Sequence, residues 1–117
     1  MREYLLLFRN ISEGEGYVIK PEDMANEMEN WQGWIGNIAM KGKLVATHPI
    51  EYKGTIVTNK AVSKGPDKDD NDVLVTGYLI CKAESEAEVE EWSKTCPILK
   101  YPNGSVEIRP IVPFPVN

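Results

Sequence analysis

The sequence is poor in the residues that several common functions require. It contains a single histidine, His48, and only two cysteines, Cys81 and Cys96. A zinc site needs several closely spaced nitrogen or sulfur ligands, and a small secreted scaffold needs more cysteines, so neither is expected. Positive charge is also scarce, because 13 Lys and Arg face 18 Asp and Glu and leave a net charge of -5. Phosphate backbones and anionic membranes repel such a chain, and we expect no nucleic acid or membrane partner.

Long apolar runs and targeting features are missing as well. No segment approaches the roughly 20 apolar residues that cross a bilayer. Residues 1–4 lead into a strand without the charged stretch and cleavage site of a signal peptide. Gly14 and Gly16 lack the third glycine of a dinucleotide-binding loop, since Ile19 stands in its place. We therefore expect a cytoplasmic protein with reduced cysteines and no organic cofactor.

The chain does contain enough apolar residues for one folded core. Of its 117 residues, 42% are hydrophobic and 26% are charged, which is ordinary for a globular protein. This length suits one domain, so we interpret residues 1–117 as a single domain. Its last segment, 110–117, contains several prolines and cannot be a central strand, so we expect an extended tail that embraces a partner chain.

Two stretches are apolar on both faces of a strand, residues 4–8 and 72–82. In the second stretch, alternation places one set of side chains on one face, Val73, Val75, Leu79 and Cys81, and another set on the opposite face, Leu74, Tyr78 and Ile80. Strands covered on both faces are central ones, and we expect these two to be parallel neighbours. Helices can cover one face only. We predict that a second copy of the chain covers the other, because each exposed apolar side chain costs on the order of 1.5 to 3 kcal/mol.

The rest of the chain predicts two helices and several strands. A helix begins at Pro21 and ends before Gly42, with a buried stripe of residues spaced by three and four, Met24, Met28, Trp31, Ile35 and Ile38. A capping box, Ser85 to Glu88, begins the second helix, and Pro97 ends it. Further strands are expected at 43–47, at 55–63 around a tight turn, and at 106–109.

This order of elements predicts an α+β fold. Strand, helix, two strands, helix and strand form the ferredoxin-like βαββαβ pattern, a four-stranded antiparallel sheet with both helices on one face. With the second copy over the open face, two such sheets would form a dimeric α+β barrel.

Several segments, taken together, resemble the YCII-related family, and its DGPF-type branch in particular. They follow one another in the family's order: Tyr-Leu-Leu-Leu-Phe-Arg-Asn at 4–10, Lys-Gly-Lys-Leu-Val-Ala at 41–46, Gly65-Pro66, Gly77-Tyr78, Thr-Cys-Pro-Ile-Leu at 95–99 and Gly-Ser-Val-Glu-Ile-Arg-Pro-Ile at 104–111. The resemblance implies a dimeric α+β barrel that handles a small molecule, and a histidine and an aspartate that have been taken to suggest an enzyme.

The chain departs from the family at both of those residues. Where the family has a histidine near the start of the first helix, this chain has Asp23, and the family's aspartate before a proline is replaced by Cys96. The motif that names the branch reads Lys-Gly-Pro-Asp at 64–67. The family's His/Asp chemistry therefore does not transfer directly to this chain.

His48 is the remaining candidate for proton transfer, since imidazole alone has an ordinary pKa near neutrality. One interpretation is that His48 acts as a general base and is oriented by Asp67 or Asp72. The other is that His48 is a solvated histidine in a loop. Cys96 lies at a helix end, where the dipole disfavours a thiolate, and is not expected to be a nucleophile.

Asp23, Trp34 and Tyr78 are the candidate ligand-binding residues, with Trp34 either in the core or at a pocket rim. The acidic residues at 67–72 do not fit a calcium loop, because Asp72 stands at the required glycine and Tyr78 at the required glutamate. We predict no metal site, although a weak divalent site formed by the aspartates of this loop remains open.

Two classes of function follow. One is a homodimeric protein that binds a small molecule without the family's His/Asp pair. The other is a cofactor-independent enzyme, such as a lyase, an isomerase or a dehalogenase-like protein, that uses His48 and a nearby carboxylate.

Overall fold

The computed structural model describes residues 1–11 and 21–115, and side chains in the first helix from Glu27 onward. Its elements, in chain order, are β1 (Arg2–Ile11), α1 (Pro21–Met40), β2 (Leu44–Pro49), β3 (Gly54–Val57), β4 (Val62–Gly65), β5 (Val73–Ala83), α2 (Glu86–Ser93), the 3-10 helix η1 (Pro97–Lys100) and β6 (Ser105–Pro110). No helix in this part of the chain is both long and apolar enough to cross a membrane. The glycine pair at 14 and 16 lies outside the described residues.

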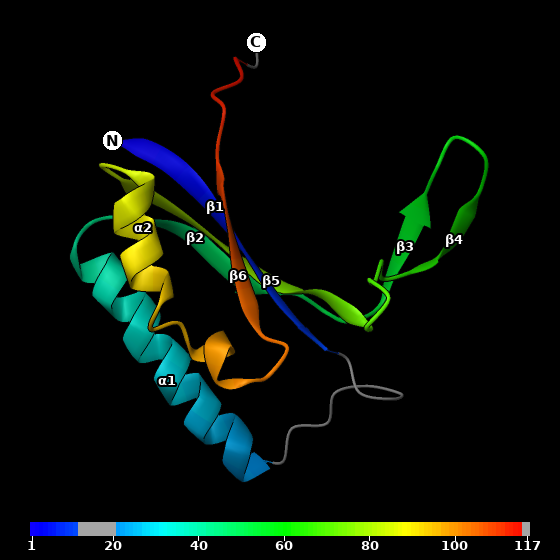
Figure 1. Cartoon of the computed structure of the whole chain (residues 1–117), viewed down its shortest axis with the longest axis horizontal. Coiled ribbons are helices and arrows are strands. Elements are labelled where there is room, and N and C mark those ends of the chain that lie inside the picture. The colour runs from blue at the N-terminus through cyan, green and yellow to red at the C-terminus, as the bar shows by residue number, and fades with distance from the viewer. Residues whose placement is uncertain (12–20, 116–117) are drawn as a thin grey trace.

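Four strands form one antiparallel sheet in the order β2-β5-β1-β6 (Figure 1). One hydrophobic core joins β1 and β5 to both helices, through buried residues such as Leu6, Leu79, Ile38 and Val89. The ferredoxin-like α+β fold is thus confirmed. The expected parallel pairing of the two apolar strands is wrong, because β1 and β5 run antiparallel. Burial of both faces requires a central position in a sheet, and it does not fix strand direction.

A bulge in β5 changes which side chains face the helices. Phe8 pairs with Gly77 and Arg9 pairs with Val75, so Thr76 is an extra residue between them. Beyond this point the alternation is reversed. Leu74 is therefore buried on the helix side, at 2% exposure, instead of lying on the opposite face from Leu79 as strict alternation predicts.

The buried stripe of α1 is rotated relative to the expected one. Glu27, Trp34 and Ile38 are buried, whereas Met28 is 54% exposed. The side chain of Met24 lies outside the described residues. The stripe therefore turns a carboxylate toward the sheet, and places Trp34 in the core.

The second helix begins as expected and ends earlier. The Ser85 hydroxyl accepts a hydrogen bond from the Glu88 amide, and the Glu88 carboxylate accepts one from the Glu84 amide. Lys43 donates to both oxygens of Glu88, at 2.8 and 2.9 Å, and this holds the pKa of that carboxyl below its usual value. The helix ends at Ser93, and Pro97 begins η1.

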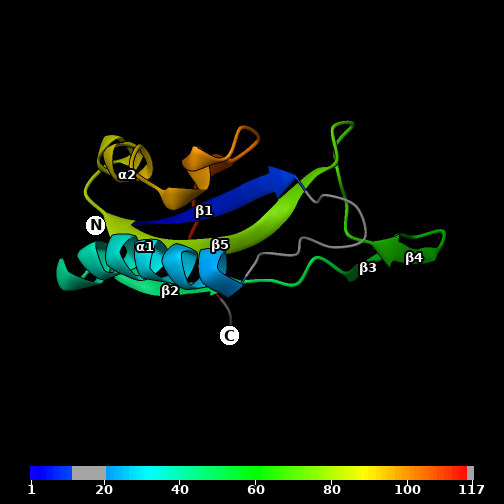
Figure 2. The ribbon, with the colours of Figure 1, turned by 90° about the horizontal axis from the view of Figure 1, so that it is seen from below.

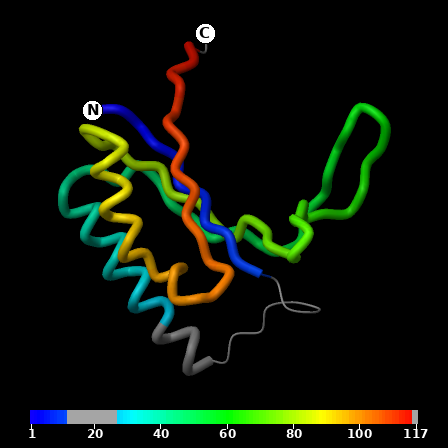
Figure 3. The backbone as a smooth tube through the Cα atoms, viewed as in Figure 1, coloured from blue at the N-terminus to red at the C-terminus, as the bar shows by residue number. Residues whose placement is uncertain are grey.

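The chain between β2 and β5 leaves the main sheet. β2 continues through His48 to Pro49, two residues beyond the end of the strand expected at 43–47. The expected turn is confirmed, since Thr58 and Ala61 close a hairpin of β3 and β4. Figures 1 and 3 show this hairpin extending away from the four-stranded sheet. The tail also leaves the body, with Phe114 at 84% exposure.

Both cysteines are free thiols inside the core. Burial raises the pKa of Cys81 to about 11 and that of Cys96 to about 12. At neutral pH both groups are therefore protonated and poor nucleophiles. For Cys96, burial raises the pKa, whereas the sequence suggested the dipole of a helix end.

We predict that neither thiol reacts with a disulfide reagent such as DTNB in the native protein at pH 8. Two equivalents should react once urea unfolds the chain, because the thiols then regain ordinary pKa values and access. Fast release of one equivalent from native protein would show that a cysteine is a reactive thiolate.

Gly104 allows η1 and β6 to lie close together. A Cβ atom at this position would lie 1.8 Å from the carbonyl oxygen of Ile98. We predict that Gly104→Ala lowers the free energy of unfolding by about 3 kcal/mol, the upper part of the range for overpacking. Gly33→Ala is the matched control, because nothing lies within 4 Å of its Cβ position in α1. It should stabilise by up to about 1 kcal/mol in the same urea titrations.

Candidate functional site

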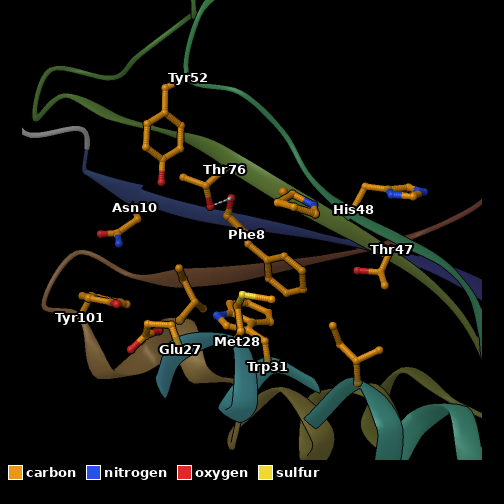
Figure 4. A pocket seen from close by; sticks show the side chains of 14 residues that line it. Phe8, Asn10, Glu27, Met28, Trp31, Thr47, His48, Tyr52, Thr76 and Tyr101 are labelled. Atoms are coloured by element: carbon orange, nitrogen blue, oxygen red, sulfur yellow. Dashed lines mark hydrogen bonds between the residues drawn. The ribbon is translucent and has the colours of Figure 1, made fainter. Parts of the chain in front are cut away.

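A cavity of about 470 Å³ lies between α1 and the end of the sheet where β1, β2 and β5 meet. The residues that form its apolar wall are Phe8, Met28, Trp31, Ile35, Pro49, Gly77 and Ile98. The polar residues at its surface are Asn10, Glu27, Thr47, His48, Tyr52, Thr76 and Tyr101. Figure 4 shows Phe8, Met28 and Trp31 near the middle, with Asn10, Glu27 and Tyr101 together at one end.

Aromatic side chains hold the apolar wall in place. The ring of Phe8 meets that of Trp31 edge to face, with centroids 5.0 Å apart, and meets Trp34 at 6.0 Å. Trp34 donates a hydrogen bond of 2.9 Å from its indole nitrogen to the carbonyl of Trp92. This hydrogen bond holds Trp34 in the core, and Trp34 in turn supports Phe8 and Trp31. The apolar wall is therefore preorganised.

The β5 bulge forms part of the cavity. The hydroxyl of Thr76, the extra residue, donates to the carbonyl of Phe8 at 3.3 Å. At the next residue, Gly77, a Cβ atom would lie 3.1 Å from the carbonyl oxygen of His48 and 3.3 Å from Cα of Pro49. Glycine therefore permits the close approach of β2 and β5 beside the pocket.

Asn10 presents a hydrogen-bond donor to the cavity. Its side chain is 6% exposed, and its Oδ1 accepts a bond of 2.8 Å from the amide of Ile11. Its amide nitrogen donates to no protein atom among the described residues, and this nitrogen keeps some contact with solvent, since no fully buried side-chain nitrogen or oxygen there lacks a partner. That nitrogen can therefore donate to an acceptor on a molecule inside the pocket.

Glu27 provides the one carboxylate among the described lining residues. It is 9% exposed and forms an ion pair with Lys100 of η1. The Lys100 ammonium also lies over the ring of Tyr101, 5.4 Å from its centroid. One cationic group is thus held by a carboxylate and an aromatic face at the polar end of the cavity.

His48 lies at the edge of the pocket, and its ring faces elsewhere. It pairs across the sheet with Tyr78, and the two rings are 5.9 Å apart. Tyr78 lies on the face away from the helices, since its neighbours Gly77 and Leu79 are buried on the helix side. Figure 4 shows the imidazole pointing away from the other labelled side chains. The structure thus joins His48 to Tyr78 outside the pocket.

The acidic loop is separate from these residues. Asp67 and Asp72 are exposed in the segment between β4 and β5, and neither is hydrogen-bonded to His48 in the described structure. Asp69 accepts hydrogen bonds from the amides of Asn71 and Val73, which orders the turn before β5. Among the side chains that the structure describes, no group of three His, Cys, Asp or Glu residues could hold a metal ion.

Of the other two candidate ligand-binding residues, Trp34 does not line the cavity but lies beneath its wall, in the core. Asp23 belongs to α1, and its side chain lies outside the described residues. The sequence reasoning missed Asn10, Glu27 and Tyr101. The sequence did contain a signal for Glu27. Helical spacing places this charged residue on the same face as Trp31, Trp34 and Ile38, where an apolar residue is expected.

The described lining combines an apolar wall with a few polar groups. No serine, cysteine or lysine is present among the described lining residues, and the lining threonines Thr47 and Thr76 donate to backbone carbonyls. What the arrangement offers is an apolar body site with a donor and a carboxylate at one end.

Comparison with known proteins identifies the family of this chain. No curated protein matched the chain. The model of the YCII-related domain matches residues 4–115, which is nearly the whole chain. The protein therefore belongs to the YCII-related family.

Proposed function

We propose that the protein is a homodimeric small-molecule-binding protein that works without the family's His/Asp pair. The observation that carries this proposal is the cavity of about 470 Å³ with its apolar wall and its polar end. The size and the lining are those of small-molecule sites, which are concave, mostly apolar and furnished with few polar groups. A ligand with an apolar body and a hydrogen-bond acceptor near Asn10 fits this arrangement.

Binding without turnover is supported by the separation of the ionisable groups. Proton transfer requires a base within hydrogen-bond reach of the substrate, held by a second group. His48 points away from the cavity, and Glu27 is already paired with Lys100. No acid–base pair is therefore formed within the described lining. Such a pocket can bind a molecule without converting it.

The dimer is supported by the face of the sheet away from the helices. Leu5, Leu7, Tyr78 and Ile80 lie together there, half-exposed, on the two central strands. An ion pair between Arg9 and Glu107 lies beside them, and the arginine holds the pKa of Glu107 below its usual value. An apolar centre with a charged edge is the usual composition of an interface between two protein chains.

Partly filling the pocket should weaken the binding of a neutral apolar dye. N-phenyl-1-naphthylamine fluoresces more strongly in apolar surroundings, and we expect it to bind the native protein with micromolar affinity. Met28→Trp places a larger side chain at the pocket wall and should weaken this binding at least tenfold. Met40→Trp, on the same helix but outside the lining and 88% exposed, should not change it. Equal binding by both variants would place the dye elsewhere.

A charge on the open sheet face should separate the dimer. We expect native protein to sediment with twice the mass of one chain, and Leu7→Glu to sediment as a monomer with an unchanged circular dichroism spectrum. Burying an unpaired carboxylate in an interface costs several kcal/mol. Leu7→Glu should therefore strongly weaken the association of the two chains. Met40→Glu is the control and should remain dimeric. A native protein that sediments as a monomer at micromolar concentration would contradict the proposed assembly.

A further inference from the structure

The charge of the lining restricts the ligands that this pocket can take. Among the described lining residues there is a single carboxylate, Glu27, and no lysine or arginine. An anionic ligand would bring a second negative charge next to a carboxylate that is 9% exposed. The described lining adds no lysine or arginine to offset that charge, and the nearby ammonium of Lys100 is already paired with Glu27. The lining therefore disfavours acids and phosphates.

The same end of the pocket already holds an ammonium group. Lys100 is not a lining residue, yet its Nζ pairs with Glu27 and lies 5.4 Å from the centre of the Tyr101 ring. Both Glu27 and Tyr101 do line the cavity. A carboxylate together with an aromatic face is a general arrangement for binding organic cations. The chain's own lysine thus shows which chemical group these two side chains accept.

We propose that the ligand is an organic amine with an apolar, aromatic-sized body, and that its ammonium replaces Lys100 at Glu27. The apolar body lies along Phe8 and Trp31, and the ammonium lies between Glu27 and Tyr101. This inference rests on the proposed small-molecule-binding function and names its ligand class.

The exchange keeps the charges balanced at each stage. Lys100 has a side chain that is 47% exposed, while that of Glu27 is 11% exposed, so the lysine can turn into water and the glutamate cannot. When a ligand ammonium enters from the cavity side, Glu27 remains paired, and one cation has replaced another. Lys100 is then a competitor of the ligand, and removing it strengthens binding. A lysine that merely stabilised the pocket would have the opposite effect.

Three compounds with one indole body and different head groups test this proposal. Tryptamine is cationic, tryptophol is neutral and indole-3-acetate is anionic at pH 7. Each is titrated against the protein with bound N-phenyl-1-naphthylamine, and displacement of the dye is measured. We expect tryptamine to displace the dye at about tenfold lower concentration than tryptophol, since hydrogen bonds to charged groups are the stronger ones. Indole-3-acetate should be the weakest.

Two variants assign the effect to named residues. Glu27→Gln should remove the preference for tryptamine over tryptophol while the dye still binds. Lys100→Gln should increase the affinity for tryptamine several-fold and leave that for tryptophol unchanged. Lys94→Gln is the matched control, because Lys94 is also paired, with Glu91 at 2.6 Å, and lies outside the lining. It should change neither affinity.

The outcomes separate this inference from the function on which it rests. If the dye does not bind the native protein, the small-molecule function fails and the amine proposal fails with it. If the dye binds but tryptophol or indole-3-acetate displaces it as well as tryptamine does, the function stands and the amine proposal is wrong. Unchanged or weaker tryptamine binding by Lys100→Gln would also overturn it, and this variant keeps the test decisive should Glu27→Gln fail to fold.

Discussion

Two central strands are apolar on both faces, and the rest of the structure depends on how these faces are buried. β1 and β5 carry apolar side chains on each side, and the sheet order places them next to each other in the middle. The helices bury the middle of one face, as the zero exposure of Leu6, Leu79 and Cys81 shows. Figure 2 shows α1 in front of the strands, on this face. On the other face, Leu5, Leu7 and Ile80 remain partly exposed. The same requirement thus produces the core, places α1 across the sheet, and leaves the partly exposed apolar surface on which the proposal of a dimer rests.

The features of the fold that depend on composition and periodicity were predictable from the sequence. The two-sided strands, the Ser85 capping box and the hairpin turn at Thr58 each express a local preference, and the order of elements then allows few topologies. Strand direction was predicted wrongly because apolar content reports burial and carries no information about direction. The faces of Leu74 and Val75 were also assigned wrongly, because the extra residue at Thr76 interrupts a pattern that has no local marker of its own.

The polar end of the pocket was harder to predict, because it joins residues that are far apart in sequence. Asn10, Glu27 and Tyr101 come from β1, α1 and the segment after η1, and only the folded sheet brings them to one cavity. Sequence reasoning instead favoured His48 with Asp67 or Asp72, since histidine and aspartate are the usual residues of proton transfer. Their separation follows from the pairing of His48 with Tyr78, which turns the ring to the opposite face. A carboxylate within an apolar helix stripe was the more informative signal.

The close contact between Gly104 and Ile98 has a consequence for the selectivity of the proposed ligand binding. The carbonyl of Ile98 accepts a hydrogen bond from the Tyr101 amide, and Gly104 in turn donates to the Tyr101 carbonyl. The backbone that carries Lys100 and Tyr101 is therefore fastened at both ends over a few residues. A guest molecule does not have to order this segment, and the conformational entropy that recognition would otherwise cost has been lost already during folding. Preorganisation of this kind favours discrimination by head group over adaptation to many shapes.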